Sequence, residues 1–481
     1  MASAEPRNRE LKKIRLFLVN VGQRSHLYPL ATPPLGCLYI AGYLRSRFSL
    51  DIQVINQRIE GCSFEEVARR AVDFGADIVG LGSMTPTAHG MPVIASAVRA
   101  LKPDTFIVLG GPHVSAFGAP ALEQTVANAA VSGEGELSMG MILEAYLNGS
   151  GLDQIPGLMW RNEKGEVITN PGMAPMVEDL DSLPMPAYDL IDLSKYWRTQ
   201  SMPPIPRRKY VSLLSSRGCP YACMWCHNIF GRHFRAHSPE RIVEEITQHV
   251  KRYGIDDVEF VDDSFNLNEK RLFDFVDLLL KKHGPIKIAF PNAVRADLLD
   301  ESSVDALVQA GTYFSSFALE SGSPRIQELT GKRLNIPKFL EAINLAVKRG
   351  VFTNGFMMLG FPTETEAEME ETIRVATESQ LHTASFFTVT PFPNTRLYEY
   401  AKEHFPEKLG QVDYSDMNFC RMRVNMSAVP DEKLFYFQRK AERGFFLKPG
   451  RIYRILRDYP QPHLLPLYAH IFLDRLLKGL F

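Results

Sequence analysis

Short apolar, β-branched runs alternate with amphipathic stretches along the first third of the chain. The runs typical of buried strands are residues 14–20, 51–56, 76–81, 105–109 and, as a short fifth, 129–131. Between them, residues 35–47, 64–74 and 91–101 repeat apolar positions at helical spacing. This alternation predicts a doubly wound, Rossmann-like α/β domain over residues 10–151, with helices on both faces of a parallel sheet.

A proline-rich connector follows at residues 152–207. It contains one predicted hairpin, whose turn at residues 162–165 lies between the apolar stretches 158–160 and 167–168. No residue of this connector suggests chemistry of its own.

Strands and helices alternate again between residues 208 and 410. The predicted strands are residues 211–214, 258–261, 286–290, 313–319, 354–359 and 384–389. Six β/α units predict a partial (β/α)6, TIM-like barrel, and catalytic groups of such barrels project from the carboxyl ends of the strands. Residues 411–481 are predicted to form a helical extension.

Composition excludes several classes of protein. The chain has 481 residues, 45% of them hydrophobic and 23% charged, which suits a soluble globular protein of two domains. The formal net charge of −1 leaves no global basic field, so we expect no nucleic-acid partner. Neither a signal-peptide pattern nor an apolar run of about 18 residues is present, which predicts a cytoplasmic protein.

Half of the six cysteines lie within eight positions, as Cys219, Cys223 and Cys226, with the spacing C-x3-C-x2-C. Three thiolates on one loop can hold three irons of a 4Fe-4S cube and leave the fourth iron open to a chelating substrate. The alternative is a zinc site completed by His227 or by a distant ligand. No second Cys/His pair at zinc spacing follows, which disfavours zinc. The scattered cysteines, expected to be small buried hydrophobes, are Cys37, Cys62 and Cys420.

The triplet resembles the signature of the radical S-adenosylmethionine (SAM) superfamily, C-x3-C-x-aromatic-C, with Trp225 in the aromatic position. The resemblance implies that the open iron chelates the amino and carboxylate groups of SAM. Reduction then cleaves SAM to methionine and a 5′-deoxyadenosyl radical. It also implies a flavodoxin- or ferredoxin-type electron donor.

Further elements of that family follow the predicted barrel strands in the expected order. Asp262 and Asp263 follow the second strand and can accept from the ammonium group of SAM, although a helix N-cap is an equal alternative for Asp263. Arg295 follows the third strand and suits a carboxylate. Glu320 and Ser321 begin an E-S-G-s element, which the family places near the ribose and methionine of SAM. The last two elements are the G-x-P-x-E of residues 360–364 and the P-x-P-x-T-x-L of residues 391–397.

The loops after the strands of the first domain are rich in small and polar residues. The candidates are Ser83 and Thr85 after the third strand, Gly110, Gly111 and His113 after the fourth, and Gly133 and Glu134 after the fifth. Ligands of doubly wound sheets bind at this edge, and small residues let a bulky ligand touch backbone. No loop has the G-x-G-x-x-G pattern, so a dinucleotide is not favoured.

A sheet of this kind directly before a radical SAM core resembles the cobalamin-binding domain of cobalamin-dependent radical SAM enzymes. The resemblance implies a corrin ring on the strand ends, although a response-regulator or flavodoxin-like domain would share the pattern. The D-x-H-x-x-G signature, which supplies a histidine to cobalt in other cobalamin proteins, is absent. We therefore expect His26 and His113 to be loop residues rather than cobalt ligands.

These resemblances imply a cobalamin-dependent radical SAM enzyme that methylates an unactivated carbon of a small-molecule substrate. The first alternative is a radical cyclase or carbon–carbon coupling enzyme acting on a lipid, isoprenoid or tetrapyrrole without methyl transfer. The second is a redox or cobalamin sensor without turnover, which the SAM-contacting elements disfavour.

The last predicted helix, Leu464 to Phe481, carries a broad apolar face interrupted by charge. We expect this helix to dock on the barrel. The alternative is peripheral contact with the inner face of the membrane, which would suit a lipid or isoprenoid substrate.

Overall fold

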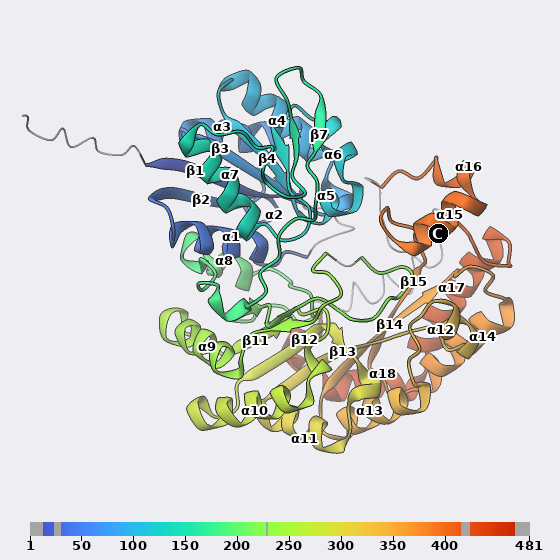
Figure 1. Cartoon of the computed structure of the whole chain (residues 1–481). Coiled ribbons are helices and arrows are strands. Elements are labelled where there is room, and N and C mark those ends of the chain that lie inside the picture. The colour runs from blue at the N-terminus through green and yellow to red at the C-terminus, as the bar shows by residue number, and fades with distance from the viewer. Residues whose placement is uncertain (1–12, 24–29, 228, 415–423, 467–481) are drawn as a thin grey trace, which may run out of the picture. The chain divides into compact units, whose positions relative to one another are not determined.

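The structure is a computed structural model that describes residues 13–23, 30–227, 229–414 and 424–466. The chain divides into two compact units (Figure 1). The first unit holds residues 13–23, 36–175 and 183–191 of the described chain, and the second holds the remainder.

The first unit contains a seven-stranded sheet in the order β2-β1-β3-β4-β5-β6-β7. The strands are β1 (Ile14–Val21), β2 (Leu50–Asn56), β3 (Ile78–Ser83), β4 (Phe106–Gly110), β5 (Ala129–Ala130), β6 (Met159–Arg161) and β7 (Val167–Thr169). The first five are parallel, as the sequence predicts, and the order 2-1-3-4-5 places the topological switch point between β1 and β3. The predicted hairpin, β6–β7, adds antiparallel to β5 and extends this sheet.

Helices lie on both faces of this sheet. They are α1 (Leu35–Arg45), α2 (Gln57–Glu60), α3 (Phe64–Asp73), α4 (Gly90–Leu101), α5 (Gly111–Phe117), α6 (Ala119–Glu123) and α7 (Glu136–Asn148). One core packs α3, α4, α5 and α6 against alternate strand residues such as Val19, Leu81 and Leu109. Figure 1 shows α3 and α4 above the strands and α1 below them.

The second unit contains six parallel strands in the order β15-β14-β13-β12-β11-β8. They are β8 (Tyr210–Leu213), β11 (Asp257–Phe260), β12 (Lys287–Val294), β13 (Thr312–Glu320), β14 (Phe352–Leu359) and β15 (Thr383–Thr388). Strand neighbours follow chain order, which confirms the predicted TIM-like arrangement of six β/α units. Two short strands, β9 (Ser216–Arg217) and β10 (Arg235–Ala236), form a separate antiparallel pair.

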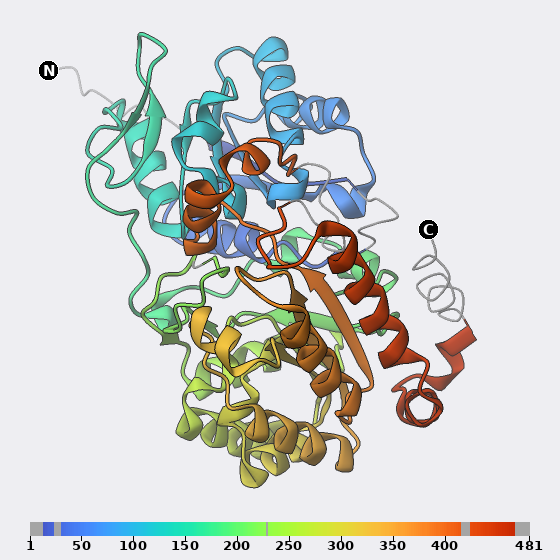
Figure 2. The ribbon, with the colours of Figure 1, turned by 90° about the vertical axis from the view of Figure 1, so that its right-hand side faces the viewer.

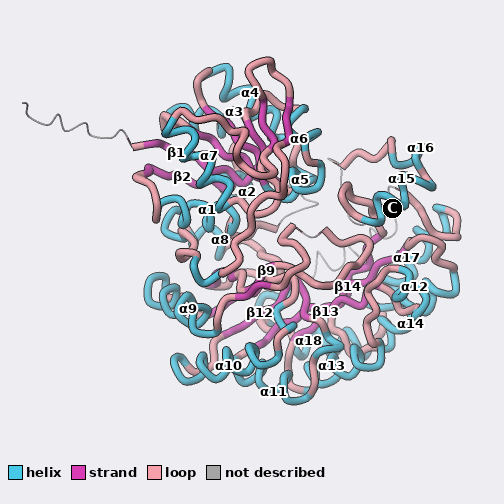
Figure 3. Tube along the Cα trace, in the orientation of Figure 1, coloured by secondary structure: helices cyan, strands magenta, loops and turns pink. Residues whose placement is uncertain are grey.

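Helices form an outer arc around these strands (Figures 1 and 3). They are α9 (Pro239–Tyr253), α10 (Glu269–His283), α11 (Glu301–Ala310), α12 (Pro324–Leu329), α13 (Ile336–Lys348) and α14 (Glu366–Glu378). The next helix, α15 (Arg396–His404), follows β15 and lies apart from this arc, beside α16 (Pro406–Leu409). Local signals set the helix ends. Ser238 Oγ accepts from the backbone N–H of Arg241 to start α9, and Gly254 ends it with a φ of 63°.

The C-terminal region packs against the barrel as far as it is described. It contains α17 (Asp431–Phe446) and α18 (Pro449–Asp458). Figure 2 shows α17 along β15, where Gln438 Nε2 donates to the carbonyl of Phe386 over 2.9 Å. Tyr459, just after α18, joins an apolar cluster with Phe314 and Phe352 and donates to the carbonyl of Pro204 over 2.8 Å.

The predicted helix from Leu464 to Phe481 falls largely outside the described residues, so its docking stays a prediction. Among the helices that the structure describes, none is long and apolar enough to cross a bilayer.

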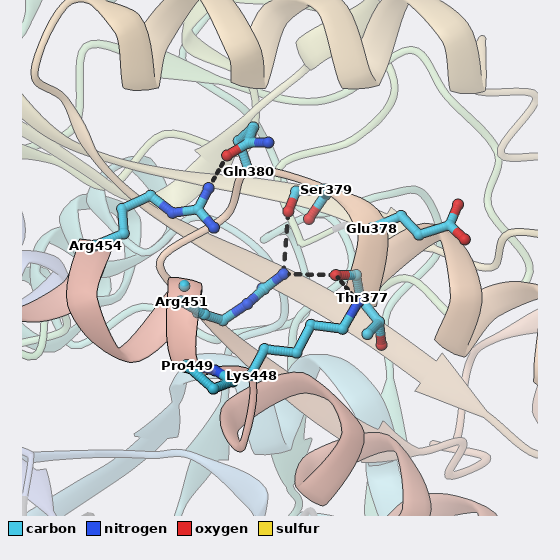
Figure 4. A pocket seen from close by; sticks show the side chains of 9 residues that line it. Thr377, Glu378, Ser379, Gln380, Lys448, Pro449, Arg451 and Arg454 are labelled. Carbon is cyan, nitrogen blue, oxygen red and sulfur yellow. Dashed lines mark hydrogen bonds between the residues drawn. The ribbon is translucent and has the colours of Figure 1, made fainter.

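Arg451 joins α18 to the end of α14, beside a pocket that both helices line (Figure 4). The residue is only 2% exposed, and its guanidinium lies 3.4 Å from the ring centroid of Phe445. It donates to the carbonyls of Thr377 (2.8 Å), Ser379 (3.0 Å) and Leu381 (3.1 Å). A helix leaves its last carbonyls without partners, and a cation there complements the helix dipole. This contact therefore fixes α18 to the barrel.

We expect Arg451→Met to lower the free energy of unfolding by about 2–3 kcal/mol, because three hydrogen bonds to carbonyls are lost and, among the described residues, only the Thr377 carbonyl keeps another donor, Lys448 Nζ at 3.3 Å. Arg439→Met, the same change at an exposed position of α17, should stay within about 0.5 kcal/mol of the wild type. Denaturant unfolding of both variants measures the difference. Equal midpoints would show that the Arg451 contacts do not stabilise the fold.

Candidate functional site

The predicted cysteine loop closes on the β9–β10 pair. β8 leads into β9, and residues 218–234 run from there to β10. Gly218 makes the closure possible, because its φ is +84° and a Cβ there would lie 2.2 Å from the carbonyl oxygen of His233. The backbone N–H of Cys219 donates across the loop to the carbonyl of Gly231 over 3.3 Å.

Two helices hold the middle of the loop. The backbone N–H of Met224 donates to the carbonyl of Thr330 after α12 (2.9 Å), and the carbonyl of Met224 accepts from the N–H of Leu397 in α15 (2.8 Å). Trp225 packs on Phe361 with ring centroids 5.2 Å apart. The residue in the family's aromatic position therefore anchors the loop to the segment after β14.

The three thiols share one electrostatic environment. Cys226 as a whole is exposed, but loss of water around its thiol, followed by the charges of Cys223, Asp263 and Cys219, raises its pKa to about 12. Burial also raises the pKa of Cys219 and Cys223. Thiols in such a place stay protonated at neutral pH unless a metal supplies positive charge, and they fit a cationic cluster.

The three thiols are not arranged around a single point, as ligands of one metal ion would be. In the described part of the chain, no group of three His, Cys, Asp or Glu side chains is arranged to hold a single metal ion. A four-iron cube takes each thiolate on a different iron, so its ligands need not converge on one point.

Lys332 lies beside the cysteine loop and was not predicted from the sequence. Its Nζ is 3.7 Å from Glu320 Oε1, and its positive charge opposes the rise in pKa of all three thiols. Gly331 before it has a φ of +72°, and a Cβ there would lie 3.2 Å from the carbonyl oxygen of Ala222. A lysine after a helix is common, so nothing in the sequence pattern pointed to this one.

The two predicted aspartates differ in their surroundings. Asp262 is buried, and its Oδ1 accepts from the hydroxyls of Ser215 (2.8 Å) and Ser216 (2.5 Å). Its Oδ2 is buried without a partner, and burial raises its pKa although Arg271 opposes the rise. Asp263 as a whole is exposed, but loss of water around its carboxyl and the charge of Asp262 raise its pKa to about 6. Asp262 braces the start of the cysteine loop, and Asp263 is the more available of the two.

Arg295, predicted to take a carboxylate, already binds one. Its Nε donates to Asp297 Oδ1 over 2.9 Å and its Nη2 to Asp297 Oδ2 over 3.2 Å. The guanidinium also lies 3.7 Å above the ring centroid of Tyr221, and Nη2 donates to the carbonyl of Lys332 over 3.1 Å. Arg295 thus joins the cysteine loop to the turn after α12.

Glu320 and Ser321 stand at a bulge where β13 ends. Glu320 has a φ of +66°, and burial raises the pKa of its carboxyl although Lys332 opposes this. Ser321 is buried, and its Oγ accepts from the backbone N–H of Ser323 over 3.2 Å. Ser321 therefore shapes the loop from within, while the Glu320 carboxyl pairs with Lys332.

Backbone strain gathers at the carboxyl ends of the barrel strands. Left-handed φ values occur at Ala293 (78°), Glu320 (66°), Thr363 (60°) and Asn394 (62°), which lie near the ends of β12, β13, β14 and β15. Such conformations cost free energy in residues other than glycine and tend to gather at functional sites.

The G-x-P-x-E segment after β14 is held by its own glutamate. Glu364 is buried, and its Oε2 accepts from the backbone N–H groups of Gly360 (2.7 Å) and Phe361 (3.0 Å). Burial raises its pKa to about 8. The carboxyl fixes the turn that presents Phe361 to Trp225.

In the first unit, the loops after β3 and β4 pack closely, backbone against backbone, because a glycine lies at their contact. Gly111 has a φ of +84°, and a Cβ there would lie 3.1 Å from the backbone nitrogen of Ser83. Ser83 Oγ donates to the carbonyl of Met84 over 2.9 Å and lies 3.0 Å from Thr87 Oγ1. The nearest atom to a Cβ on Gly110 would be the carbonyl oxygen of Val131, at 3.9 Å, which brings the loop after β5 to the same edge.

The other predicted residues of this edge are also brought together. The backbone N–H of Gly133 donates to Ser115 Oγ in α5 over 2.9 Å. Thr85 and Glu134 are buried. His113 packs on Phe117 at 4.5 Å, its Nδ1 is buried without a hydrogen-bond partner, and burial lowers its pKa to about 4. His26 lies outside the described residues.

A cradle of small residues and an unpartnered buried nitrogen beside the switch point suit a large ligand. Comparison with known proteins identifies that ligand's class. The B12 binding domain family matches residues 28–142, and the radical SAM superfamily matches residues 213–376. An uncharacterized methyltransferase of Pyrococcus horikoshii is 32% identical over 422 residues, which cover 87% of this chain and 88% of the relative. The chain belongs to the cobalamin-dependent radical SAM enzymes of methyltransferase type.

A second curated protein and one solved structure are also similar to this chain. An anaerobic magnesium-protoporphyrin IX monomethyl ester cyclase of Rubrivivax gelatinosus is 25% identical, over 86% of this chain and 74% of the cyclase. The structure of the radical SAM methyltransferase TsrM from Kitasatospora setae, with cobalamin and a [4Fe-4S] cluster bound, has a TM-score of 0.69 at 18% identity. That match covers 90% of this chain and 85% of TsrM, and it shows a shared fold.

The predicted family, fold class and enzyme class are therefore confirmed. So are the three cofactors of this cobalamin-dependent radical SAM enzyme, a 4Fe-4S cluster, SAM and cobalamin. The roles of single residues remain predictions.

We expect Gly218→Ala to lose most of the iron found in the anaerobically reconstituted wild type, about four per chain for one cluster, because a Cβ would collide with the His233 carbonyl. Gly254→Ala is the matched control. Its φ of +63° carries similar strain, about 1 kcal/mol, but a Cβ there meets nothing within 4 Å. Iron analysis measures the iron bound per chain in both variants and in a Cys219/Cys223/Cys226→Ala triple variant, which should bind no cluster. Full iron in the Gly218 variant or in the triple variant would contradict the assignment.

Proposed function

We propose that this radical SAM enzyme methylates an unactivated carbon of a small-molecule substrate. When bound, the cluster and cobalamin supply the reductive cleavage of SAM to a 5′-deoxyadenosyl radical and the carriage of the methyl group. One observation carries the proposal. One chain contains both a loop with three thiols and a sheet edge lined by small residues. The same chain is similar in sequence to a methyltransferase over 88% of that relative's length.

Cys219, Cys223 and Cys226 would each hold one iron and leave the fourth open to SAM. Asp263 would accept from the SAM ammonium group, since Asp262 is already held by two serine hydroxyls. Asp297 occupies Nε and Nη2 of Arg295, so Arg295 would bind the SAM carboxylate only through the part of its guanidinium that Asp297 does not occupy.

The Glu320–Lys332 pair would contribute charge of both signs beside the thiols. Trp225 and Ser321 would contribute to SAM binding by fixing loops, because both side chains pack within the protein.

At the sheet edge, the backbone of Gly110, Gly111 and Gly133 would let cobalamin approach. The polar groups around that approach would come from Ser83, Thr85, Glu134 and the neutral imidazole of His113. We propose the boundaries 10–151 for the cobalamin-binding part, 152–207 for the linker, 208–410 for the radical SAM part and 411–481 for the C-terminal region.

The cyclase relative supports a second candidate, a radical cyclisation or carbon–carbon coupling without methyl transfer. A lipid, isoprenoid or tetrapyrrole substrate and a peripheral membrane contact through Leu464–Phe481 belong to this candidate. Both candidates need a flavodoxin- or ferredoxin-type electron donor.

Labelled SAM separates the two candidates. Reconstituted protein is incubated anaerobically with reductant, a small-molecule extract and SAM that carries a deuterated methyl group. We expect 5′-deoxyadenosine together with a product that gains one deuterated methyl group. A product without the label, formed with 5′-deoxyadenosine, would favour the cyclase, and no 5′-deoxyadenosine at all would refute both.

We further expect cob(II)alamin bound to the full-length protein to show no nitrogen superhyperfine splitting in electron paramagnetic resonance. The reason is that the sequence lacks the cobalt-binding histidine signature, and the His113 ring packs on Phe117. The spectrum should be the same for His113→Ala and His26→Ala. Splitting that disappears in either variant would identify that histidine as a cobalt ligand.

A further inference from the structure

The cysteine loop reaches the surface at Ala222, the residue bonded directly to Cys223. Ala222 is exposed, and two arginines hold the carbonyls at this point. Arg232 Nη1 donates to the carbonyl of Tyr221 over 2.8 Å, and Arg396 Nη1 donates to the carbonyl of Ala222 over 3.4 Å. Guanidinium groups from two separate segments therefore meet the backbone of the loop at Ala222.

Most of this positive charge is uncompensated. Arg232 and Arg396 are exposed, and neither forms an ion pair with a described residue. Arg333 is also exposed, but its charge is compensated by Glu328 at 2.6 Å. The whole chain has a formal net charge of −1, so the positive charge at this point is local.

We propose that Ala222, Arg232 and Arg396, here called the arginine rim, are the docking surface for an acidic one-electron carrier protein. The proposal rests on the proposed function, which requires a reduced cluster. Local charge of one sign steers an oppositely charged partner and raises its association rate. The backbone from Ala222 to Cys223 is the direct covalent route from the rim to a cluster ligand.

The step balances with one electron. The carrier is oxidised by one electron and the cluster held by the loop is reduced by one, while no bond forms or breaks and no proton moves. A reduced flavodoxin supplies the electron in the test below.

The test compares two reductants on full-length reconstituted protein. Freeze-quench electron paramagnetic resonance follows the reduced cluster after mixing with reduced flavodoxin or with dithionite, a small reductant that needs no docking surface. We expect the ratio of the two rates to fall at least tenfold in Arg232→Glu/Arg396→Glu. In Arg232→Lys/Arg396→Lys, which keeps the charge, the ratio should stay within about twofold of the wild type. Arg439→Glu on α17 controls for a charge reversal elsewhere.

Added salt should slow the flavodoxin reaction of the wild type and should have little effect on the glutamate variant, because salt screens exposed charges. An unchanged ratio in the glutamate variant would overturn the proposal, as would an equal loss in the lysine variant. This readout does not depend on SAM cleavage. Rim-dependent reduction without 5′-deoxyadenosine would therefore refute the proposed function and leave the docking surface standing.

Discussion

The second unit depends on holding three thiols close together on one short loop. Loss of water and the charges of neighbouring groups raise the pKa of Cys226 to about 12, so its thiol stays protonated until a metal takes the place of the proton. Lys332 and Arg295 oppose the rise in the pKa of Cys223, from the turn after α12 and from the end of β12. The backbone fixes the middle of the loop, because Met224 is hydrogen-bonded on one side to Thr330 and on the other to Leu397. Such fixed positions favour a single ligand geometry.

Several polar residues around this loop are already hydrogen-bonded to groups of the protein itself. Asp262 accepts from two serines, Glu364 accepts from the turn before it, and Arg295 is paired with Asp297. Buried carboxyls held in this way cost free energy if a partner is lost, so they fix the strand ends in one arrangement. The left-handed residues at the same ends are compatible with that arrangement because the surrounding contacts compensate for their strain.

The sheet edge of the first unit follows a different rule, since it provides space rather than charge. Gly111 lies against the backbone of Ser83, and a Cβ there would press on that backbone and push the two loops apart. His113 is neutral at physiological pH because burial lowers its pKa to about 4. A glycine-lined edge with a neutral imidazole suits a large corrin ring, whose many contacts come from shape more than from ion pairs.

Periodicity and spacing in the sequence determined the two sheets, their helices and the cysteine triplet, because those features repeat over a few residues. The pattern could not tell that the hairpin β6–β7 joins the first sheet, since strand pairing depends on contacts beyond the hairpin itself. It also could not tell that Asp262, and not Asp263, is held by two serine hydroxyls. Only the tertiary structure placed Lys332 and the arginine rim beside the cysteine loop. Arg396 and Ala222 are 174 positions apart in the sequence, and a contact between residues so far apart produces no recognisable spacing in a single sequence.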